Sequence, residues 1–279
     1  YKSFNNQIVD LDKKFIIQKE RNEYEGAELR KRQHVFGYSI EDLELILHPM
    51  AEDGKEAIGS MGDDTPLAVL SDKFRPLYHF FRQNFSQVTN PPIDSLRENK
   101  VMSLKTRFGN LGNILDFNNL TEENIYVLNS PILSNTQFDK FTKYFGKNFK
   151  IFDCTFGSDE TLEESLNKLK KECEIYVRQG ITQIILSDKN ISEDRFPIPM
   201  LLCIGAINTN LIELGLRGYV SINVQTGETL DTHSFATIIG MGATTVNPYL
   251  AFDSIFERCR KKLFDNFNYD ECVKQYINS

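Results

Sequence analysis

The sequence lacks tryptophan, has five cysteines in 279 residues and contains no long apolar run. No stretch approaches the roughly 18 apolar residues that a membrane-spanning helix needs, so no membrane contact is expected. The cysteines are odd in number and widely scattered, which is typical of free thiols in a reducing compartment. The sequence therefore predicts a cytoplasmic protein.

Basic residues are too few and too dispersed for a nucleic-acid surface. The 32 Lys and Arg are outnumbered by 39 Asp and Glu, for a net charge of −7. The densest basic runs, at 30–32 and 258–262, are short, whereas binding to a phosphate backbone requires extended clusters of Lys and Arg. No nucleic-acid partner is predicted.

The familiar catalytic motifs are also missing. The sequence has no CxxC pair, no GxSxG elbow, no GxxxxGK[ST] loop and no GxGxxG fingerprint. Its four histidines share no spacing that would place two of them on one face for a metal. We therefore predict no catalytic residue, no metal ligand and no cofactor-binding residue in this chain.

The composition, 41% hydrophobic and 25% charged, is that of an ordinary globular protein with enough length to bury a core. The chain begins at Tyr1 without a methionine, a signal segment or a transit pattern. We interpret it as a part of a longer polypeptide.

Residues 1–120 are predicted to form an N-terminal arm followed by a helical segment. Residues 1–35 are polar and charged, which is typical of a linker or of an arm that lies on a neighbour. Ser39 and Asp42 then resemble a capping box, and the short helix that they begin is expected to end at His48-Pro49.

A second helical stripe and a stiff loop complete this part. Apolar residues recur at helical spacing from Pro76 onward: Leu77, Tyr78, Phe81, Phe85 and Val88. The loop that follows reads Thr89-Asn90-Pro91-Pro92-Ile93-Asp94. Two prolines restrict its backbone, and the polar residues beside them suit a contact surface or a channel wall. A plain corner between two helices is an equally good interpretation.

Residues 121–279 are predicted to form the α/β part of the same domain, with strands and helices in alternation. Five short apolar runs predict strands, at 125–128, 149–153, 182–187, 219–224 and 243–246. The clearest helices span 161–179, opened by a Thr161/Glu164 capping box, and 199–214. Such alternation predicts βα units around a parallel sheet, as an open sheet or a partial TIM-barrel-like arrangement.

Two features could still support an enzyme. The glycine-rich segment 240–243 could hold a phosphate or a flavin, but it follows a helix rather than a strand, and tight helix-to-strand packing is favoured. Asp231 and His233 could orient each other as acid and base. The simpler interpretation is that Thr232 caps a helix that begins at His233.

The same segments resemble the central domain of the glutamate synthase large subunit. The resemblance runs from about residue 34 to 252, in one order, through these motifs: FGY (36–38), MAEDGKE (50–56), GSMGDDTPLAVLS (59–71), VTNPPID (88–94), ILSD (185–188), PIP (197–199), GLR (215–217) and NPYLA (247–251). Several motifs in a fixed order make this signal specific.

The resemblance implies a non-catalytic domain. In this family it links a glutamine amidotransferase domain to an FMN-binding synthase domain that carries an iron-sulfur cluster, and together these make two glutamates from glutamine and 2-oxoglutarate. The nucleophilic cysteine and the cluster cysteines of those domains are missing here. FMN and the cluster are thus expected in the full-length enzyme, and none in this fragment. A small reductase subunit or ferredoxin would be a further partner of the whole enzyme.

The resemblance also implies a role in the ammonia tunnel between the two active sites. We place Thr89 and Asn90 at its wall or at an interdomain contact, with Pro91 and Pro92 holding the loop rigid and Asp94 at its end. A neutral small molecule such as ammonia needs a narrow, water-poor path with few groups able to protonate it. The alternative is a stand-alone α/β module that binds phosphate or flavin near residues 240–243, with His233 in proton transfer.

Overall fold

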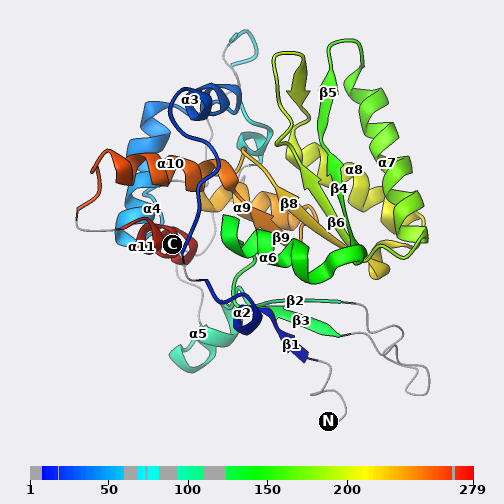
Figure 1. Ribbon diagram of the computed structural model, residues 1–279, viewed down its shortest axis with the longest axis horizontal. Coiled ribbons are helices and arrows are strands. Elements are labelled where there is room, and N and C mark those ends of the chain that lie inside the picture. Colours follow the sequence, from blue (N-terminus) through cyan, green and yellow to red (C-terminus); the bar gives the residue numbers. More distant parts are fainter. Residues whose placement is uncertain are drawn as a thin grey trace.

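The computed structural model describes residues 8–17, 19–59, 68–72, 75–81, 93–109, 124–265 and 268–279. Figure 1 shows that they form an α/β body around a parallel sheet, with a smaller sheet at one end and a two-stranded ribbon at the other. The α/β class and the parallel sheet were both predicted.

The central sheet has four parallel strands in the order β4-β6-β8-β9. Their bounds are β4 (Phe149–Asp153), β6 (Gln183–Ser187), β8 (Ser221–Gln225) and β9 (Thr245–Asn247). Four of the five predicted strands therefore lie in this sheet. The fifth, β3 (Ile125–Leu128), is a strand but belongs to the smaller sheet. The chain that leaves β3 reaches the main sheet through a parallel bridge between Ile132 and Val246.

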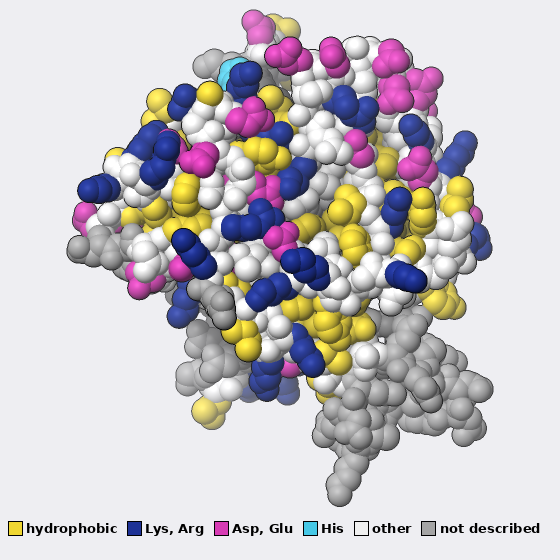
Figure 2. Space-filling model, in the orientation of Figure 1, with side chains coloured by type: hydrophobic (Ala, Val, Ile, Leu, Met, Phe, Trp, Pro, Cys, Tyr) yellow, Lys and Arg dark blue, Asp and Glu magenta, His cyan; other side chains and the backbone are white. Residues whose placement is uncertain are grey.

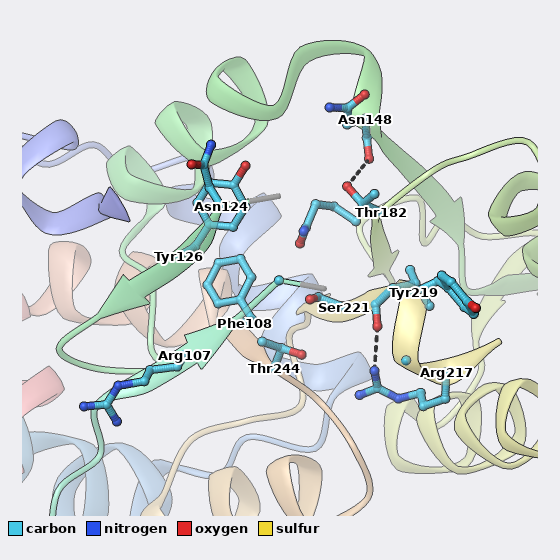
Figure 3. A pocket seen from close by; sticks show the side chains of 14 residues that line it. Arg107, Phe108, Asn124, Tyr126, Asn148, Thr182, Arg217, Tyr219, Ser221 and Thr244 are labelled. Atoms are coloured by element: carbon cyan, nitrogen blue, oxygen red, sulfur yellow. Dashed lines mark hydrogen bonds between the residues drawn. The ribbon is translucent and has the colours of Figure 1, made fainter. Parts of the chain in front are cut away.

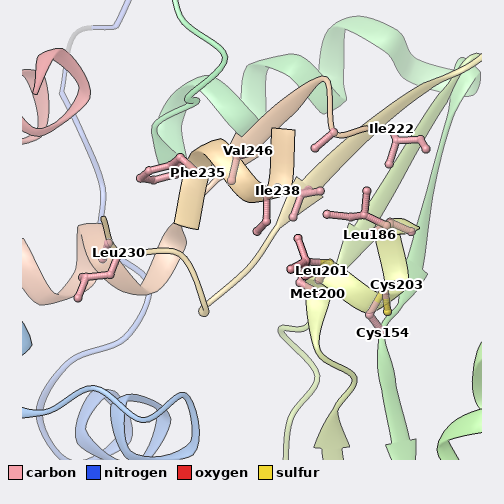
Figure 4. Packing of buried hydrophobic residues seen from close by; sticks show 14 of the residues in the cluster. Cys154, Leu186, Met200, Leu201, Cys203, Ile222, Leu230, Phe235, Ile238 and Val246 are labelled. Carbon is pink, nitrogen blue, oxygen red and sulfur yellow. The ribbon is translucent and has the colours of Figure 1, made fainter. Parts of the chain in front are cut away.

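Three helices cover one face of the sheet: α7 (Leu162–Arg178), α8 (Met200–Glu213) and α9 (Thr232–Gly240). The sheet residues of this face are apolar and join one core cluster with the helices (Figure 4). They include Ile184, Leu186, Ile222, Val224 and Val246. The first two helices are as predicted, and the Thr161/Glu164 capping box opens α7.

The other face carries side chains that hydrogen-bond to one another. We call six of them the polar ladder: Gln183, Asn223, Thr245, Ser187, Gln225 and Asn247. Asn223 donates to Gln183 at 3.0 Å and accepts from the Thr245 hydroxyl at 2.7 Å. Nearer the strand ends, Ser187 donates to Gln225 at 3.0 Å, and Gln225 donates to Asn247 at 3.1 Å. All six are buried, so the strands are half polar rather than continuously apolar.

Helix α6 (Asn135–Phe145) lies over this second face and joins it to the smaller sheet. Its Phe138, Phe141 and Phe145 pack in one cluster with Ile185 of β6 and with Leu11.

The smaller sheet has the order β1-β3-β2. Its strands and the neighbouring elements are β1 (Ile8–Asp10), α2 (Leu11–Lys14), α5 (Ser95–Val101), β2 (Thr106–Phe108) and η3 (Gly146–Asn148). The ribbon at the other end pairs β5 (Thr155–Gly157) with β7 (Arg195–Pro197).

The N-terminal residues pack on this same chain instead of extending to a neighbour. Helix α3 (Gly26–Val35) lies against α10 (Tyr249–Arg260), and its Leu29 is 1% exposed. Before it, Arg21 forms a two-pronged ion pair with Asp139 of α6, at 2.5 and 2.8 Å. The described residues 19–35 therefore pack on the body of this chain, through Leu29 and through ion pairs such as that of Arg21, where a linker or an arm on a neighbour was expected.

The helix expected to end at His48-Pro49 continues through the proline. Its first part is a π-helix, η1 (Asp42–Leu47), which runs into α4 (His48–Asp53) packed on α11 (Tyr269–Asn278). The Ser39/Asp42 capping pair forms as predicted. Pro49 is the second residue of α4, directly after the point where the π-helix gives way to the α-helix.

The apolar stripe after Pro76 is described in part. It begins as a 3-10 helix, η2 (Leu77–Phe80), and Leu77 and Tyr78 pack against the main core. Phe81 is 42% exposed. Phe85 and Val88 lie outside the described residues.

Charges on the surface are mixed. Figure 2 shows basic side chains spread among acidic and apolar ones, with acidic side chains gathered where β5 ends and α7 begins. Glu163 and Glu164 lie in the first turn of α7, where negative charge favours the helix. No helix in the described ranges combines the length and the apolar character that crossing a bilayer would require.

The start of α9 provides a matched test of capping. Asp231, not Thr232, caps this helix: its carboxylate accepts from the Ser234 N–H at 2.9 Å, and the Ser234 hydroxyl accepts from the Asp231 N–H at 3.1 Å. Asp231→Ala is expected to lower the free energy of unfolding by about 1 kcal/mol. Thr232→Ala should change it little, because Thr232 is exposed. Urea denaturation of the two variants compares them, and equal losses would contradict the assignment.

Candidate functional site

Parallel α/β sheets usually bind ligands at the carboxyl ends of their strands. Here β6 is followed by Asp188, and β8 is followed by Thr226, Gly227 and Glu228. Asp188 is fully buried and accepts hydrogen bonds from the Thr226 hydroxyl and the Gly227 N–H. Burial raises the pKa of Asp188 to about 7. The edge therefore holds an acid that is protonated far more readily than usual.

Two further acids lie in the same region. Asp253 of α10 is fully buried and accepts the backbone N–H groups of Glu23 and Tyr24 at 2.8 and 3.1 Å. Burial raises its pKa to about 7. Glu228 accepts the Met200 N–H at 3.0 Å, and burial, with the nearby Asp188, raises its pKa to about 8.

This edge is closed by the N-terminal segment of the chain itself. The Phe36 ring lies flat against Gly227, where a Cβ atom would come within 2.4 Å of the ring. Arg32 donates to the Lys189 carbonyl at 2.9 Å and stacks on Tyr24, 3.8 Å from the ring centre. The Tyr38 hydroxyl donates to the Thr229 carbonyl at 3.2 Å. Side chains of this chain thus occupy the space where a ligand would approach the strand ends.

The closed edge contains acids but no arrangement that predicts catalysis. Hydrogen bonds to the backbone hold Asp188 and Asp253 in place, and the Asn247 amide donates to the Leu133 carbonyl and to Asn135 at 2.9 and 3.0 Å. Within the described ranges, no three His, Cys, Asp or Glu side chains are grouped to hold a metal. The described cysteines are free thiols.

Sequence reasoning had not selected this edge. Asp188, Glu228 and the contact of Phe36 with Gly227 were absent from the predicted site. Asp188 directly follows a predicted buried strand, and that position was the available signal. The contact with Phe36 spans most of the chain and leaves no local pattern.

The predicted loop residues are described in part. Thr89, Asn90, Pro91 and Pro92 lie outside the described residues. Asp94 is described: it accepts the N–H groups of Leu96 and Arg97 at the start of α5 and pairs with the Arg97 guanidinium at 2.6 Å. Asp94 therefore begins a helix, and this pair is exposed to solvent.

Asp231 and His233 do not form an acid-base pair. The Asp231 carboxylate caps α9, whereas Nε2 of His233 contacts the Tyr78 carbonyl at 3.0 Å. Since a carbonyl only accepts, this nitrogen carries the proton. His233, Thr232 and Asp231 instead border a cavity of about 410 Å³, together with Ile58 and Gly59.

The glycine-rich segment after α9 packs tightly, as favoured above. Gly242 has a φ of 121°, and a Cβ atom there would lie 2.7 Å from the Asn208 side chain. Arg217 donates to the Gly242 carbonyl at 2.9 Å. The segment thus joins helix to strand, and its geometry gives no support to a phosphate loop.

Comparison with known proteins decides the family. A family model described as "Glutamate synthase central domain" matches residues 31–279. The chain belongs to the glutamate synthase central domain family. The resemblance noted in the sequence is therefore confirmed.

Relatives of this glutamate synthase domain are much longer proteins. The chain is 52% identical over 272 residues to the glutamate synthase [NADPH] large chain of Azospirillum brasilense, covering 96% of this chain and 18% of that protein. The chain is 40% identical over 261 residues to the glutamate synthase [NADPH] large chain of Bacillus subtilis, and the match covers 93% of this chain and 17% of that protein. The chain is also 40% identical over 248 residues to the chloroplastic ferredoxin-dependent glutamate synthase of Spinacia oleracea, and the match covers 87% of this chain and 15% of that protein. The chain thus spans less than a fifth of the relatives it matches.

The closed edge of the glutamate synthase domain predicts a penalty for filling the space at Gly227. Gly227→Ala should destabilise the fold by about 1–3 kcal/mol, because the new methyl group overlaps the Phe36 ring. Gly218→Ala is the control, since a Cβ there meets nothing within 4 Å. In the Gly227→Ala background, Phe36→Leu should lower the free energy of unfolding by less than it does in the wild type. Additive losses in denaturation experiments would show that this contact is not the cause.

The buried acids predict that stability falls as pH rises. The unfolded chain loses these protons near pH 4, whereas folded Asp188, Asp253 and Glu228 keep theirs to about pH 7, 7 and 8. Unfolding therefore releases protons, and stability should decrease from pH 5 to 8. Acids whose pKa is lowered, such as Glu164, titrate below this window.

A variant separates this effect from general pH dependence. Glu228→Gln keeps an acceptor for the Met200 N–H and removes one titration. It should raise stability at pH 8 by more than about 1 kcal/mol, the value of one pKa unit, and change little at pH 5. Glu213→Gln, at an exposed position of α8, is the matched control. The measurement is thermal unfolding from pH 5 to 8. If stability fell with pH as steeply in the Glu228→Gln variant as in the wild type and the control, the assignment would be refuted.

Proposed function

We propose that this chain is the central, non-catalytic domain of a glutamate synthase large chain. It would link the glutamine amidotransferase and the FMN-binding synthase domains, and would help to form the ammonia tunnel for making two glutamates from glutamine and 2-oxoglutarate. The observation that carries this proposal is the family match over residues 31–279 in relatives of which the chain covers less than a fifth.

The closed carboxyl edge supports a structural role. In a ligand-binding α/β protein this edge would be open, but here Phe36, Arg32 and Tyr38 fill it from the N-terminal side. The rest of the large chain would then hold FMN and an iron-sulfur cluster, with neither in this domain. This division of labour leaves the domain to set the distance between two active sites.

The partners follow from the same proposal. The amidotransferase and synthase domains of one polypeptide would flank the chain. Relatives named as NADPH and as ferredoxin-dependent enzymes both match it, so either a reductase subunit or ferredoxin would deliver electrons to the whole enzyme. The free thiols and mixed surface charge support a cytoplasmic location.

We propose that the domain belongs to the partial TIM-barrel-like class. The strands of the main sheet follow one another in chain order, and α7, α8 and α9 cover its apolar face. This supports βα repeats over 121–279, with 1–120 as the N-terminal arm and helical segment of the same domain. The polar ladder would then occupy the face that a complete barrel encloses.

We infer that Thr89, Asn90, Pro91 and Pro92 contribute to the tunnel wall or to an interdomain contact, with Asp94 fixing the end of the loop. The capping of α5 by Asp94 supports a defined loop end. Gly59 borders a separate cavity together with His233. The loop lies within the motif at 88–94 and Gly59 is the first residue of the motif at 59–71, so both belong to segments that carried the family resemblance.

A stand-alone phosphate- or flavin-binding enzyme is not favoured. Residues 240–243 pack against Asn208 and Arg217, and the Asp231 carboxylate caps the nearby helix where an anion would have to bind.

Uncoupling in the full-length large chain tests the tunnel proposal. Thr89→Val with Asn90→Leu should let ammonia escape, so that more glutamine is hydrolysed per glutamate formed from 2-oxoglutarate. Ammonia release, the rate of glutamine hydrolysis and the rate of glutamate formation from 2-oxoglutarate are measured in the same assay. Asn190→Leu, in an exposed turn after β6, is the control and should leave the ratio unchanged. A wild-type ratio in the double variant would refute the role of this loop.

A further inference from the structure

A cavity of about 440 Å³ lies at the amino edge of the main sheet, opposite to the closed carboxyl edge. Ser221 begins β8, and Thr244 directly precedes β9. Across the cavity, the aromatic rings of Phe108 and Tyr126 form a wall supplied by the smaller sheet (Figure 3). The volume is typical of small-molecule sites.

The cavity is positively charged although the chain carries a net charge of −7. Among the described residues that line it are Arg217 and Arg107, and none of these described lining residues is Asp or Glu. Arg107 lies on β2 with its guanidinium directed away from the other labelled side chains, whereas Arg217 lies beside Ser221 and Thr244 (Figure 3). The electrostatic character of the lining therefore differs from that of the protein as a whole.

Arg217 is held in place by neutral acceptors. Its guanidinium donates to Asn208 Oδ1 at 2.7 Å, to the Val220 carbonyl at 2.6 Å and to the Gly242 carbonyl at 2.9 Å. A guanidinium has five N–H groups, so two remain. Within the described part of the chain, no carboxylate pairs with Arg217. Burial lowers its pKa, the direction expected for a cation removed from water without a counter-ion.

Neutral polar groups face the same space. Figure 3 shows the hydroxyl groups of Ser221 and Thr244 near the Arg217 end, and the Asn124 amide near the aromatic wall. Ser221 is 7% exposed. Figure 3 marks no hydrogen bond from the Ser221 or Thr244 hydroxyl to another of the described residues that line the cavity. The two hydroxyls are therefore free to bind a ligand.

We propose that this cavity binds a small organic carboxylate. The two remaining N–H groups of Arg217 and the hydroxyls of Ser221 and Thr244 hold the carboxylate, while the carbon skeleton lies against Phe108 and Tyr126. One guanidinium balances one carboxylate, and its fork matches that group in geometry. The aromatic rings can pack against a carbon skeleton but offer inorganic phosphate no favourable contact. The wall therefore favours a carbon-containing anion.

The test uses the full-length large chain and hydrogen exchange of its backbone amides, read by mass spectrometry. Succinate, inorganic phosphate and chloride are compared at matched ionic strength. Succinate should slow exchange in peptides covering 217–222 and 242–246 in a saturable way, and phosphate should match chloride. Because the readout is local, binding of a carboxylate elsewhere in the enzyme does not produce it.

Two sets of variants complete the test. Ser221→Ala with Thr244→Val should raise the succinate concentration for half protection about tenfold or more, as expected for lost hydrogen bonds to a charged group. Ser158→Ala, exposed on the distant ribbon, should leave it unchanged. Arg217→Met should abolish protection, but it also removes contacts within the fold, which is why the hydroxyl pair is decisive.

The following results would overturn the proposal. They are no protection by succinate beyond that of chloride, equal protection by phosphate, or an unchanged response in the Ser221→Ala/Thr244→Val variant. None of them bears on the tunnel, because the variants of Thr89 and Asn90 are measured by the ratio of ammonia released to glutamate formed.

Discussion

The structure depends on the hydrogen bonds that join buried amide and hydroxyl side chains across one face of the central sheet. A buried amide without a partner costs several kcal/mol in an apolar surrounding, on the order of the whole stability of a domain. Asn223 is therefore tied to both neighbouring strands, through Gln183 and Thr245. A shift of register by one residue would break these bonds and turn the polar face toward α7 and α8. The ladder thus fixes which strands are neighbours, and it directs the apolar side chains to the opposite face.

The same requirement explains how the rest of the chain is placed. At the carboxyl ends, Asn247 carries the network into the start of α6 through Asn135, and the remaining polar groups are covered by the N-terminal segment. Asp253 accepts two backbone N–H groups of that segment, and Gly227 leaves room for Phe36. The edge that usually binds ligands in parallel α/β sheets is therefore used here to hold the domain together.

Local features of this fold could be predicted from sequence, and distant contacts could not. Helix α7 was predicted with its cap because Thr161 and Glu164 are three residues apart and each satisfies the other's backbone. Strand β3 was placed in the wrong sheet because a short apolar run does not specify its partner. Residues 19–35 looked like an arm because their anchors, such as Arg21 on Asp139, are ion pairs with residues far along the chain. The candidate loop at Thr89 to Pro92 came from the family resemblance, and its contacts stay a prediction.

The two edges of the sheet differ in charge, and this difference limits where an anion can bind. At the carboxyl edge, Asp188 and Glu228 keep their protons because burial penalises their charge. An anion there would be repelled by any acid that ionised, and the entry is filled. At the amino edge, Arg217 supplies a guanidinium cation, and no Asp or Glu is among the described residues that line the cavity. Because the guanidinium is held by three neutral acceptors before any ligand arrives, little side-chain freedom is lost on binding. A preformed positive end, facing an aromatic wall, can therefore select a carboxylate by charge and its carbon skeleton by shape.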